Sequence, residues 1–377
     1  MHSDSSKYLL CSVILLLLSI NEFSQVRFAV IGDYGLAGDN ELAVANLVKS
    51  WEPDFIVTVG DNNYPLGADS TIDQNIGQYY HEYIYPYKGN YGTGSDVNRF
   101  FPALGNHDWY SDSAKPYFSY FTLPGNERYY DFIKGDVHVF ILDSDSNEKD
   151  GVTDSSIQAA WLKKSLQSSW EKWNIVIVHH APYSSGPHGS TTFTQWPYKE
   201  WGADLILSGH DHDYERSIID SLTYIVCGNS GFSLYTFIDT INGSIVQYNS
   251  NYGALLVEAD ENKMTTKFYN TDHVLIDSVS IENRTGRFLI DNYFLDQNYP
   301  NPFNPVTKIR WLVPSPGWQT LKIYDAIGRE VKTLVDEFRS AGKYEVKFNA
   351  SDLASGIYFY SLKSGDFIQT KKMILLK

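Results

Sequence analysis

VRFAVIGD (26–33) and FIVTVGD (55–61) flank a segment of helical period over residues 40–51, and this stretch decides the fold. Each outer segment is a short run rich in β-branched and aromatic residues that ends in Gly-Asp, which is typical of a buried strand followed by a turn. The middle segment repeats its apolar residues every three or four positions, as an amphipathic helix does. The stretch therefore predicts a strand, a helix and a second strand.

The same alternation continues to residue 281. We expect a helix over 155–169, with Asp154 as its N-cap, followed by a strand over 175–178. A hairpin is predicted at YYDFIKGDVHVFILDS (129–144), with Lys134 and Gly135 in its turn. The fold class that these elements predict is α/β, a layered β-sandwich of two sheets flanked by helices.

The composition changes after residue 281. Residues 283–292 are polar, and residues 295–377 alternate apolar and polar positions between turns without a helical period. This pattern predicts a small all-β, immunoglobulin-like sandwich. We therefore expect a first folded domain over 25–282, a linker over 283–294 and a second domain over 295–377.

The first 24 residues have the pattern of an export signal. Lys7 precedes the apolar run YLLCSVILLLLSI (8–20), and a polar stretch follows up to Ser24. The run is shorter than the roughly 20 residues of a membrane-spanning helix. We expect a signal peptide over 1–24 and no stable transmembrane segment in the mature form. A buried strand or helix, or an uncleaved anchor, is the alternative.

The charge and the cysteines restrict the partners of the chain. The formal net charge is -15, and we find no stripe of Lys and Arg. Because nucleic-acid binding depends on clustered basic residues, no nucleic-acid partner is expected. The chain has two cysteines, Cys11 and Cys227, and the first lies in the predicted signal peptide. No disulfide framework is therefore available.

Polar clusters follow five of the predicted apolar strands. The clusters are Gly32-Asp33-Tyr34-Gly35, Gly60-Asp61-Asn62-Asn63-Tyr64, Gly105-Asn106-His107-Asp108, His179-His180 and Gly209-His210-Asp211-His212. In open α/β sheets, ligands bind at the carboxyl ends of the strands, so these clusters are expected to meet. Asp, Asn, Tyr and His donors together suit a hard or borderline transition metal.

Each cluster alone has a plainer interpretation. Gly-Asp after a strand is common in turns, and Asn often caps a loop. The pair His179 and His180 can be one core histidine beside one surface histidine. Five such clusters in succession, each after an apolar strand, favour a metal site instead.

These motifs resemble a known family. D-x-G (33–35), G-D-x-x-Y (60–64), G-N-H-D (105–108), H-x-P (180–182) and G-H-x-H (209–212) are similar to the five motifs of purple acid phosphatases, including the tartrate-resistant type, within the metallophosphoesterases. The resemblance covers about residues 26–281. It implies a metal-dependent acid phosphatase that hydrolyses phosphate monoesters, with Fe(III) and a divalent Fe, Zn or Mn as cofactors.

The resemblance also implies two sets of metal ligands. They are Asp33, Tyr64 and His212 for the ferric ion, Asn106, His180 and His210 for the divalent ion, and Asp61 as a bridge between the two. A phenolate suits ferric iron, and imidazoles suit divalent ions. His180 is preferred to His179 because it precedes x-Pro as the family's ligand does. Neighbouring residues on a strand point to opposite faces, so His179 is given a structural role.

The implied reaction is in-line attack on phosphorus by a hydroxide held at the two metals. His107 and His188 resemble the family's histidines that hold the phosphate and protonate the leaving oxygen. For His188, in Pro187-His188-Gly189, the alternative is a surface histidine.

The last segment resembles a second family. LDQNYPNPFNP (295–305), IYDAIGREV (323–331) and LASGIYFYSLKSG (353–365), with Lys371 and Lys372 after them, are similar to the type A sorting domain of the type IX secretion system. The resemblance implies a bacterial protein that is secreted or held at the cell surface, with the secretion machinery as a partner. A carbohydrate-binding or adhesive module is the alternative.

Two other functions stay open at this stage. A broader metallophosphoesterase would act on phosphodiesters or nucleotides, but such families usually have histidine at the position of Gly35 and lack Tyr64. A non-catalytic surface protein that reuses the fold would be expected to have lost ligands, and all the expected ligands are present in this sequence.

Overall fold

The computed structural model describes residues 25–282 and 293–377. The predicted signal peptide lies outside these residues, as does most of the predicted linker. Within the described part of the chain, no helix combines the length and apolar character needed to cross a membrane. The chain divides into two compact units at residues 283 and 284.

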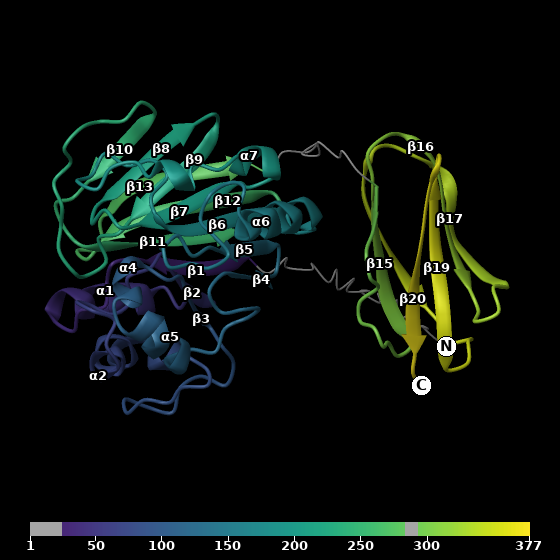
Figure 1. Cartoon of the computed structure of the whole chain (residues 1–377), viewed down its shortest axis with the longest axis horizontal. Coiled ribbons are helices and arrows are strands. Elements are labelled where there is room, and N and C mark those ends of the chain that lie inside the picture. Colours follow the sequence, from purple (N-terminus) through teal and green to yellow (C-terminus); the bar gives the residue numbers. More distant parts are fainter. Residues whose placement is uncertain (1–24, 283–292) are drawn as a thin grey trace, which may run out of the picture. The chain divides into compact units, whose positions relative to one another are not determined.

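The first unit is a sandwich of two β-sheets (Figure 1). The six-stranded sheet is ordered β13 (Leu275–Glu282), β12 (Lys263–Asn270), β11 (Gly253–Ala259), β1 (Val26–Ile31), β2 (Phe55–Thr58) and β3 (Phe100–Pro102). The seven-stranded sheet is ordered β10 (Ser244–Tyr248), β8 (Tyr214–Ile219), β9 (Leu222–Cys227), β7 (Leu205–Gly209), β6 (Trp173–His180), β5 (Val137–Ile141) and β4 (Tyr130–Lys134).

Helices pack on both sheets. Those that follow strands of the six-stranded sheet are α1 (Asp39–Ser50), α2 (Asp69–Ile72), α3 (Gln78–Tyr80), α4 (Asn106–Trp109) and α5 (Lys115–Tyr120). On the seven-stranded sheet, α6 (Ile157–Ser168) and α7 (Tyr198–Trp201) bury apolar side chains against β5, β6 and β7. The predicted layered α/β sandwich is therefore confirmed (Figure 1).

Two local predictions are corrected by a few residues. The N-cap of α6 is Ser156, whose Oγ accepts a hydrogen bond from the backbone N–H of Ala159 at 3.1 Å. Asp154 was the wrong cap because it lies in the turn before the helix. The predicted hairpin is β4 with β5, and its turn holds Gly135 and Asp136, one residue later than expected.

The parallel strands explain why the polar clusters meet. β1, β2 and β3 run parallel in one sheet, and β5, β6 and β7 run parallel in the other. Each set therefore places the residues that follow its strands at one edge of its sheet.

The second unit is all-β, as predicted. One sheet holds β14 (Phe294–Leu295), β15 (Val306–Val313) and β18 (Gly342–Asn349). The other holds β17 (Glu330–Arg339), β16 (Gly317–Tyr324), β19 (Gly356–Ser364) and β20 (Phe367–Leu375). Trp311, Leu321, Tyr360 and Met373 are among the buried residues that these strands contribute to one core.

A buried ion pair joins the two sheets of the first unit. Arg216 on β8 donates to Asp277 on β13 through Nε at 2.6 Å and through Nη2 at 3.0 Å. The hydroxyl of Tyr214 donates to the same carboxylate at 2.8 Å. Asp277→Ala would leave the guanidinium buried without its partner, so we expect the free energy of unfolding to fall by about 3 kcal/mol.

Denaturant titration measures this loss, with Lys267→Ala as the control. Lys267 pairs with Glu258 at 2.6 Å but is partly exposed, and its removal should cost about 1 kcal/mol or less. Similar losses of unfolding free energy in the two variants would show that the buried pair between the sheets contributes no more to stability than the partly exposed pair.

Candidate metal centre

The candidate ligands lie in loops that follow parallel strands of both sheets. Asp33 follows β1, Asp61 follows β2, and His210 follows β7. All three have positive φ (51°, 54° and 71°), a conformation that is uncommon outside glycine and concentrated at functional sites. The backbone N–H of His210 donates to Asp33 Oδ2 at 3.1 Å. The loops of the two sheets therefore form one site.

Three predicted ligands surround the phenol oxygen of Tyr64. It lies 3.1 Å from Asp33 Oδ1, 2.9 Å from Asp61 Oδ2 and 3.2 Å from His212 Nε2. The ring is buried and stacks on Phe232, with a centroid distance of 3.8 Å. Because one hydroxyl hydrogen cannot satisfy two carboxylates and an imidazole, this group suits a shared cation.

The pKa of Tyr64 supports the same conclusion. Burial raises the pKa of the phenol well above 10, and Asp33 and Asp61 raise it further. The phenol is therefore neutral as it stands. It would ionise only beside a strong positive charge, which a bound metal ion supplies.

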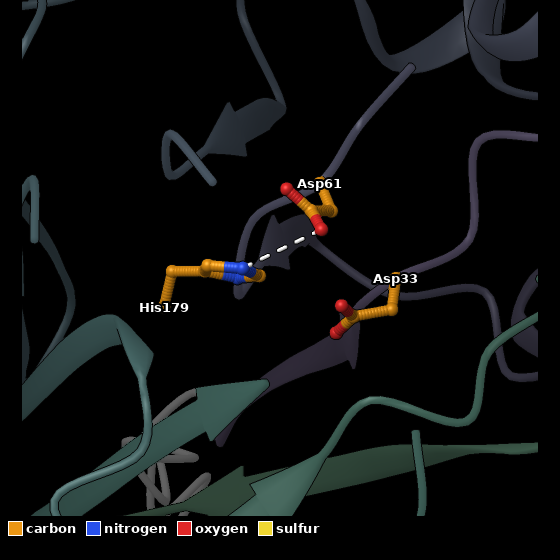
Figure 2. A group of neighbouring side chains, drawn as sticks. All are labelled: Asp33, Asp61 and His179. Atoms are coloured by element: carbon orange, nitrogen blue, oxygen red, sulfur yellow. Dashed lines mark ion pairs between the residues drawn. The ribbon is translucent and has the colours of Figure 1, made fainter. Parts of the chain in front are cut away.

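His179 lies in the same cluster. Its Nε2 is 3.5 Å from Asp61 Oδ2 and 3.1 Å from Asn106 Oδ1. Asp33, Asp61 and His179 each place a possible ligand atom within 4.8 Å of the others, and all three are buried (Figure 2). The other ring nitrogen, Nδ1, donates to the carbonyl of Val59 at 2.9 Å. The lone pair that remains for a metal is thus on Nε2.

The pKa of His179 indicates where positive charge is required. Burial lowers this pKa, but Asp61 and Asp33 outweigh burial and raise it to about 10. In turn, the pKa of Asp61 is lowered because His179 and His107 outweigh the effect of its burial. The carboxylates of Asp61 and Asp33 thus favour a positive charge at this position.

The contacts of His180 differ from those predicted. Ser144 Oγ accepts a hydrogen bond from the backbone N–H of His180 at 3.0 Å and lies 2.8 Å from its Nδ1. Its ring packs against the ring of His210 at 4.4 Å. Within the described residues, it is thus His179 rather than His180 that lies with Asp33 and Asp61 in the buried group of possible ligand atoms. The two rings do not diverge as expected: their centroids lie 5.1 Å apart, and the pairing of β6 with β7 is irregular between Ile177 and His180.

The remaining predicted ligands lie around this cluster. His212 Nε2 is 3.3 Å from Asp33 Oδ1, and its Nδ1 is 3.0 Å from Ser233 Oγ. The ring of His210 lies 5.1 Å from that of His179. Burial, with help from His179, lowers the pKa of His210, so the imidazole stays in the neutral form that can bind a metal.

Asn106 is held by its amide group. Its Nδ2 donates to the hydroxyl of Tyr110 at 3.1 Å, and its Oδ1 lies against His179. The oxygen, which is the metal-binding atom of an amide, therefore points toward the cluster.

The two predicted acid–base histidines both lie beside candidate ligands. The Nδ1 of His107 is 2.6 Å from the carbonyl of Pro65, and its Nε2 is 3.9 Å from Asp61 Oδ2. His188 is exposed, and its ring stacks on His210 with a centroid distance of 4.1 Å. Both side chains are thus close enough to the cluster to meet a substrate bound there.

Asp108 is a buried residue beside the cluster to which the sequence analysis assigned no role. Its buried carboxylate accepts hydrogen bonds from the backbone N–H of Gly105 at 2.9 Å and from the side chain of Asn62 at 2.8 Å. It thereby ties the loop of Asp61 to the loop of Asn106. The sequence signal for this role is the Asp at the fourth position of G-N-H-D. An Asp at that position is equally compatible with a metal ligand, so the motif alone does not indicate which role it has.

Comparison with known proteins is consistent with this geometry. A profile of the calcineurin-like phosphoesterase family matches residues 26–214, about half of the chain. The chain belongs to this family. A profile of the secretion system C-terminal sorting domain matches residues 297–376. The predicted resemblances to the metallophosphoesterases and to the sorting domain are therefore confirmed.

Purple acid phosphatases are among the relatives of this phosphoesterase. Purple acid phosphatase 17 of Arabidopsis thaliana is 31% identical over 218 residues, which are 50% of this chain and 62% of that protein. Human tartrate-resistant acid phosphatase type 5 is 22% identical over 55% of this chain and 73% of its own length. The chain thus spans less than two thirds of the first of these relatives.

Solved structures share the fold. A purple acid phosphatase from yellow lupin seeds superposes with a TM-score of 0.57 and 19% identity, covering 69% of this chain and 54% of that one. GAP50, described as the anchor in the inner membrane complex of Plasmodium, superposes with a TM-score of 0.55 and 20% identity, covering 69% and 90%. At this identity the likeness concerns the fold.

Proposed function

We propose that this phosphoesterase is an exported acid phosphatase that hydrolyses phosphate monoesters at a centre of Fe(III) and a divalent Fe, Zn or Mn. The observation that carries the proposal is the position of the Tyr64 phenol against Asp33, Asp61 and His212. A phenolate among carboxylates and imidazoles is a donor set for ferric iron. The purple acid phosphatases among its relatives agree with it.

The donor atoms fit two ions. Asp33, Tyr64 and His212 would hold the ferric ion, Asn106, His179 and His210 the divalent ion, and Asp61 would bridge them. The second set takes His179 in place of the predicted His180 because of its contacts with Asp61 and Asn106. When bound, such a pair would activate water and neutralise phosphate charge.

The chain's own residues would bind and protonate the substrate. His107 is fixed by its contact with the Pro65 carbonyl, which leaves Nε2 facing the site to hold a phosphate oxygen. His188 lies against His210 at the exposed side, where it can give a proton to the leaving oxygen.

Export completes the proposed function. The predicted signal peptide over 1–24 would direct the chain across the inner membrane, and the sorting domain would then engage the type IX secretion machinery. The enzyme would act on phosphate esters outside the cell or at its surface.

The test uses the purified full-length chain. We expect a visible absorption band from the phenolate–iron pair, iron plus a second metal by elemental analysis, and hydrolysis of a chromogenic phosphomonoester at about pH 5. A colourless protein with zinc or manganese alone and neutral phosphodiesterase activity would assign it to the broader phosphoesterases. A protein that binds no metal would be a non-catalytic one.

A further inference from the structure

The loop that carries His188 is held by two buried carboxylates. Asp211 lies between the two histidines of the G-H-x-H motif, and Glu215 is four residues later, on β8. Each carboxylate is 1% exposed. Neither lies among the proposed metal ligands, and both direct their oxygens toward residues 184–189.

Asp211 binds the peptide of His188 itself. Its Oδ1 accepts a hydrogen bond from the backbone N–H of His188 at 2.8 Å, and its Oδ2 accepts one from Gly189 at 3.2 Å. The hydroxyl of Ser184 donates to Oδ2 at 2.5 Å. Gly186 packs so closely on this carboxylate that a Cβ there would lie 2.4 Å from Asp211 Cγ. The loop is thus built around the side chain of Asp211.

Glu215 binds the same loop at another point. It accepts hydrogen bonds from the backbone N–H and the hydroxyl of Ser185, at 2.7 and 2.6 Å. The hydroxyl of Ser244 on β10 also donates to it, at 2.5 Å. It therefore fixes the start of the loop to the sheet, but no hydrogen bond joins it to the His188 peptide among the described residues.

The ring of His188 needs this anchoring because little else restrains it. The side chain is exposed, with its ring stacked on His210 and 5.6 Å from the ring of Tyr235. An imidazole that protonates a leaving oxygen must lie within hydrogen-bond reach of it. For an exposed ring, the position of the backbone decides how often that geometry is reached.

We propose that Asp211 is a positioning residue for His188 and thereby controls protonation of the leaving group, an inference that rests on the proposed function. It acts through the two backbone N–H groups rather than through the metals or the phosphate. The efficiency of the enzyme on esters with poor leaving groups then depends on Asp211, because these esters require a proton in the transition state.

The experiment compares Asp211→Asn with the matched control Glu215→Gln in the metal-loaded full-length chain. For ethyl phosphate, Asp211→Asn should lower kcat/KM by about 10- to 100-fold, which is within the range of general-acid catalysis. For 4-nitrophenyl phosphate, whose leaving group needs little protonation, the loss should be less than about threefold. Glu215→Gln should leave the ratio of kcat/KM for ethyl phosphate to kcat/KM for 4-nitrophenyl phosphate unchanged.

Two further measurements separate positioning from general damage. In a His188→Gln background, Asp211→Asn should have no additional effect on ethyl phosphate, since the two changes act on one step. Hydrogen exchange should show that the 184–190 segment loses amide protection in Asp211→Asn. Ser184→Ala removes one hydrogen bond of the Asp211 carboxylate, so it should also lower kcat/KM more for ethyl phosphate than for 4-nitrophenyl phosphate, but by less. If Asp211→Asn does not fold, Ser184→Ala takes its place in the experiment.

Several results would overturn the inference. They are equal losses on both esters, an effect of Asp211→Asn that persists without His188, or a loss of bound metal in Asp211→Asn. If the wild-type protein binds metals and hydrolyses both esters while Asp211→Asn matches it, the positioning role alone fails. If the wild-type protein hydrolyses neither ester, the proposed function fails and the inference with it.

Discussion

His179→Ala is expected to remove one bound metal ion and to lower kcat/KM by more than about 100-fold, whereas His180→Phe should keep both metals. Removing a residue that merely supports a metal ligand already costs about 10- to 100-fold, so removing a ligand should cost more. His179 Nε2 lies near Asp61 and Asn106 within the buried cluster. The side chain of His180 contacts Ser144 and the rings of His179, Phe193 and His210.

Phenylalanine tests position 180 more specifically than alanine would. It keeps an aromatic ring against His210 and loses the contact with Ser144, which is worth about 1 kcal/mol of stability. For both variants, elemental analysis measures the metal content and steady-state kinetics measures kcat/KM. Loss of metal from His180→Phe, with full occupancy in His179→Ala, would restore the assignment made from the H-x-P motif.

Tyr64→Phe is expected to bleach the protein and to remove most of its ferric iron. The change deletes one oxygen that lies within 3.2 Å of Asp33, Asp61 and His212. The phenyl ring would keep the stack on Phe232, so the fold should stay intact. Because the proposed colour comes from a phenolate bound to Fe(III), the visible band should disappear rather than shift.

Tyr34→Phe is the matched control for this experiment. Tyr34 is also buried, and its hydroxyl donates to Asn62 at 3.1 Å outside the cluster of carboxylates. This variant should keep its colour and its iron. A Tyr64→Phe protein that remains purple would show that another group supplies the charge-transfer band, and the proposed ferric site would be wrong.

Local sequence patterns predicted the architecture well because they depend on neighbouring residues. Short apolar strands and helical periods up to residue 281 correspond to the two sheets and their helices. The same patterns placed the cap of α6 at Asp154 instead of Ser156. Both are good capping residues, and the choice between them depends on where the chain can begin to pack against the sheet.

The amino-acid sequence was sufficient to predict the fold class, the change to an all-β unit and the clustering of the polar motifs, since periodicity and residue type carry that information. It could not decide between His179 and His180, because alternation along a strand says that the two diverge but not which one faces inward. Nor could it reveal the carboxylate of Asp211 under the His188 loop. The first depends on contacts of His179 with loops of the other sheet, and the second on a contact between two loops of the seven-stranded sheet, and both form only in the folded chain.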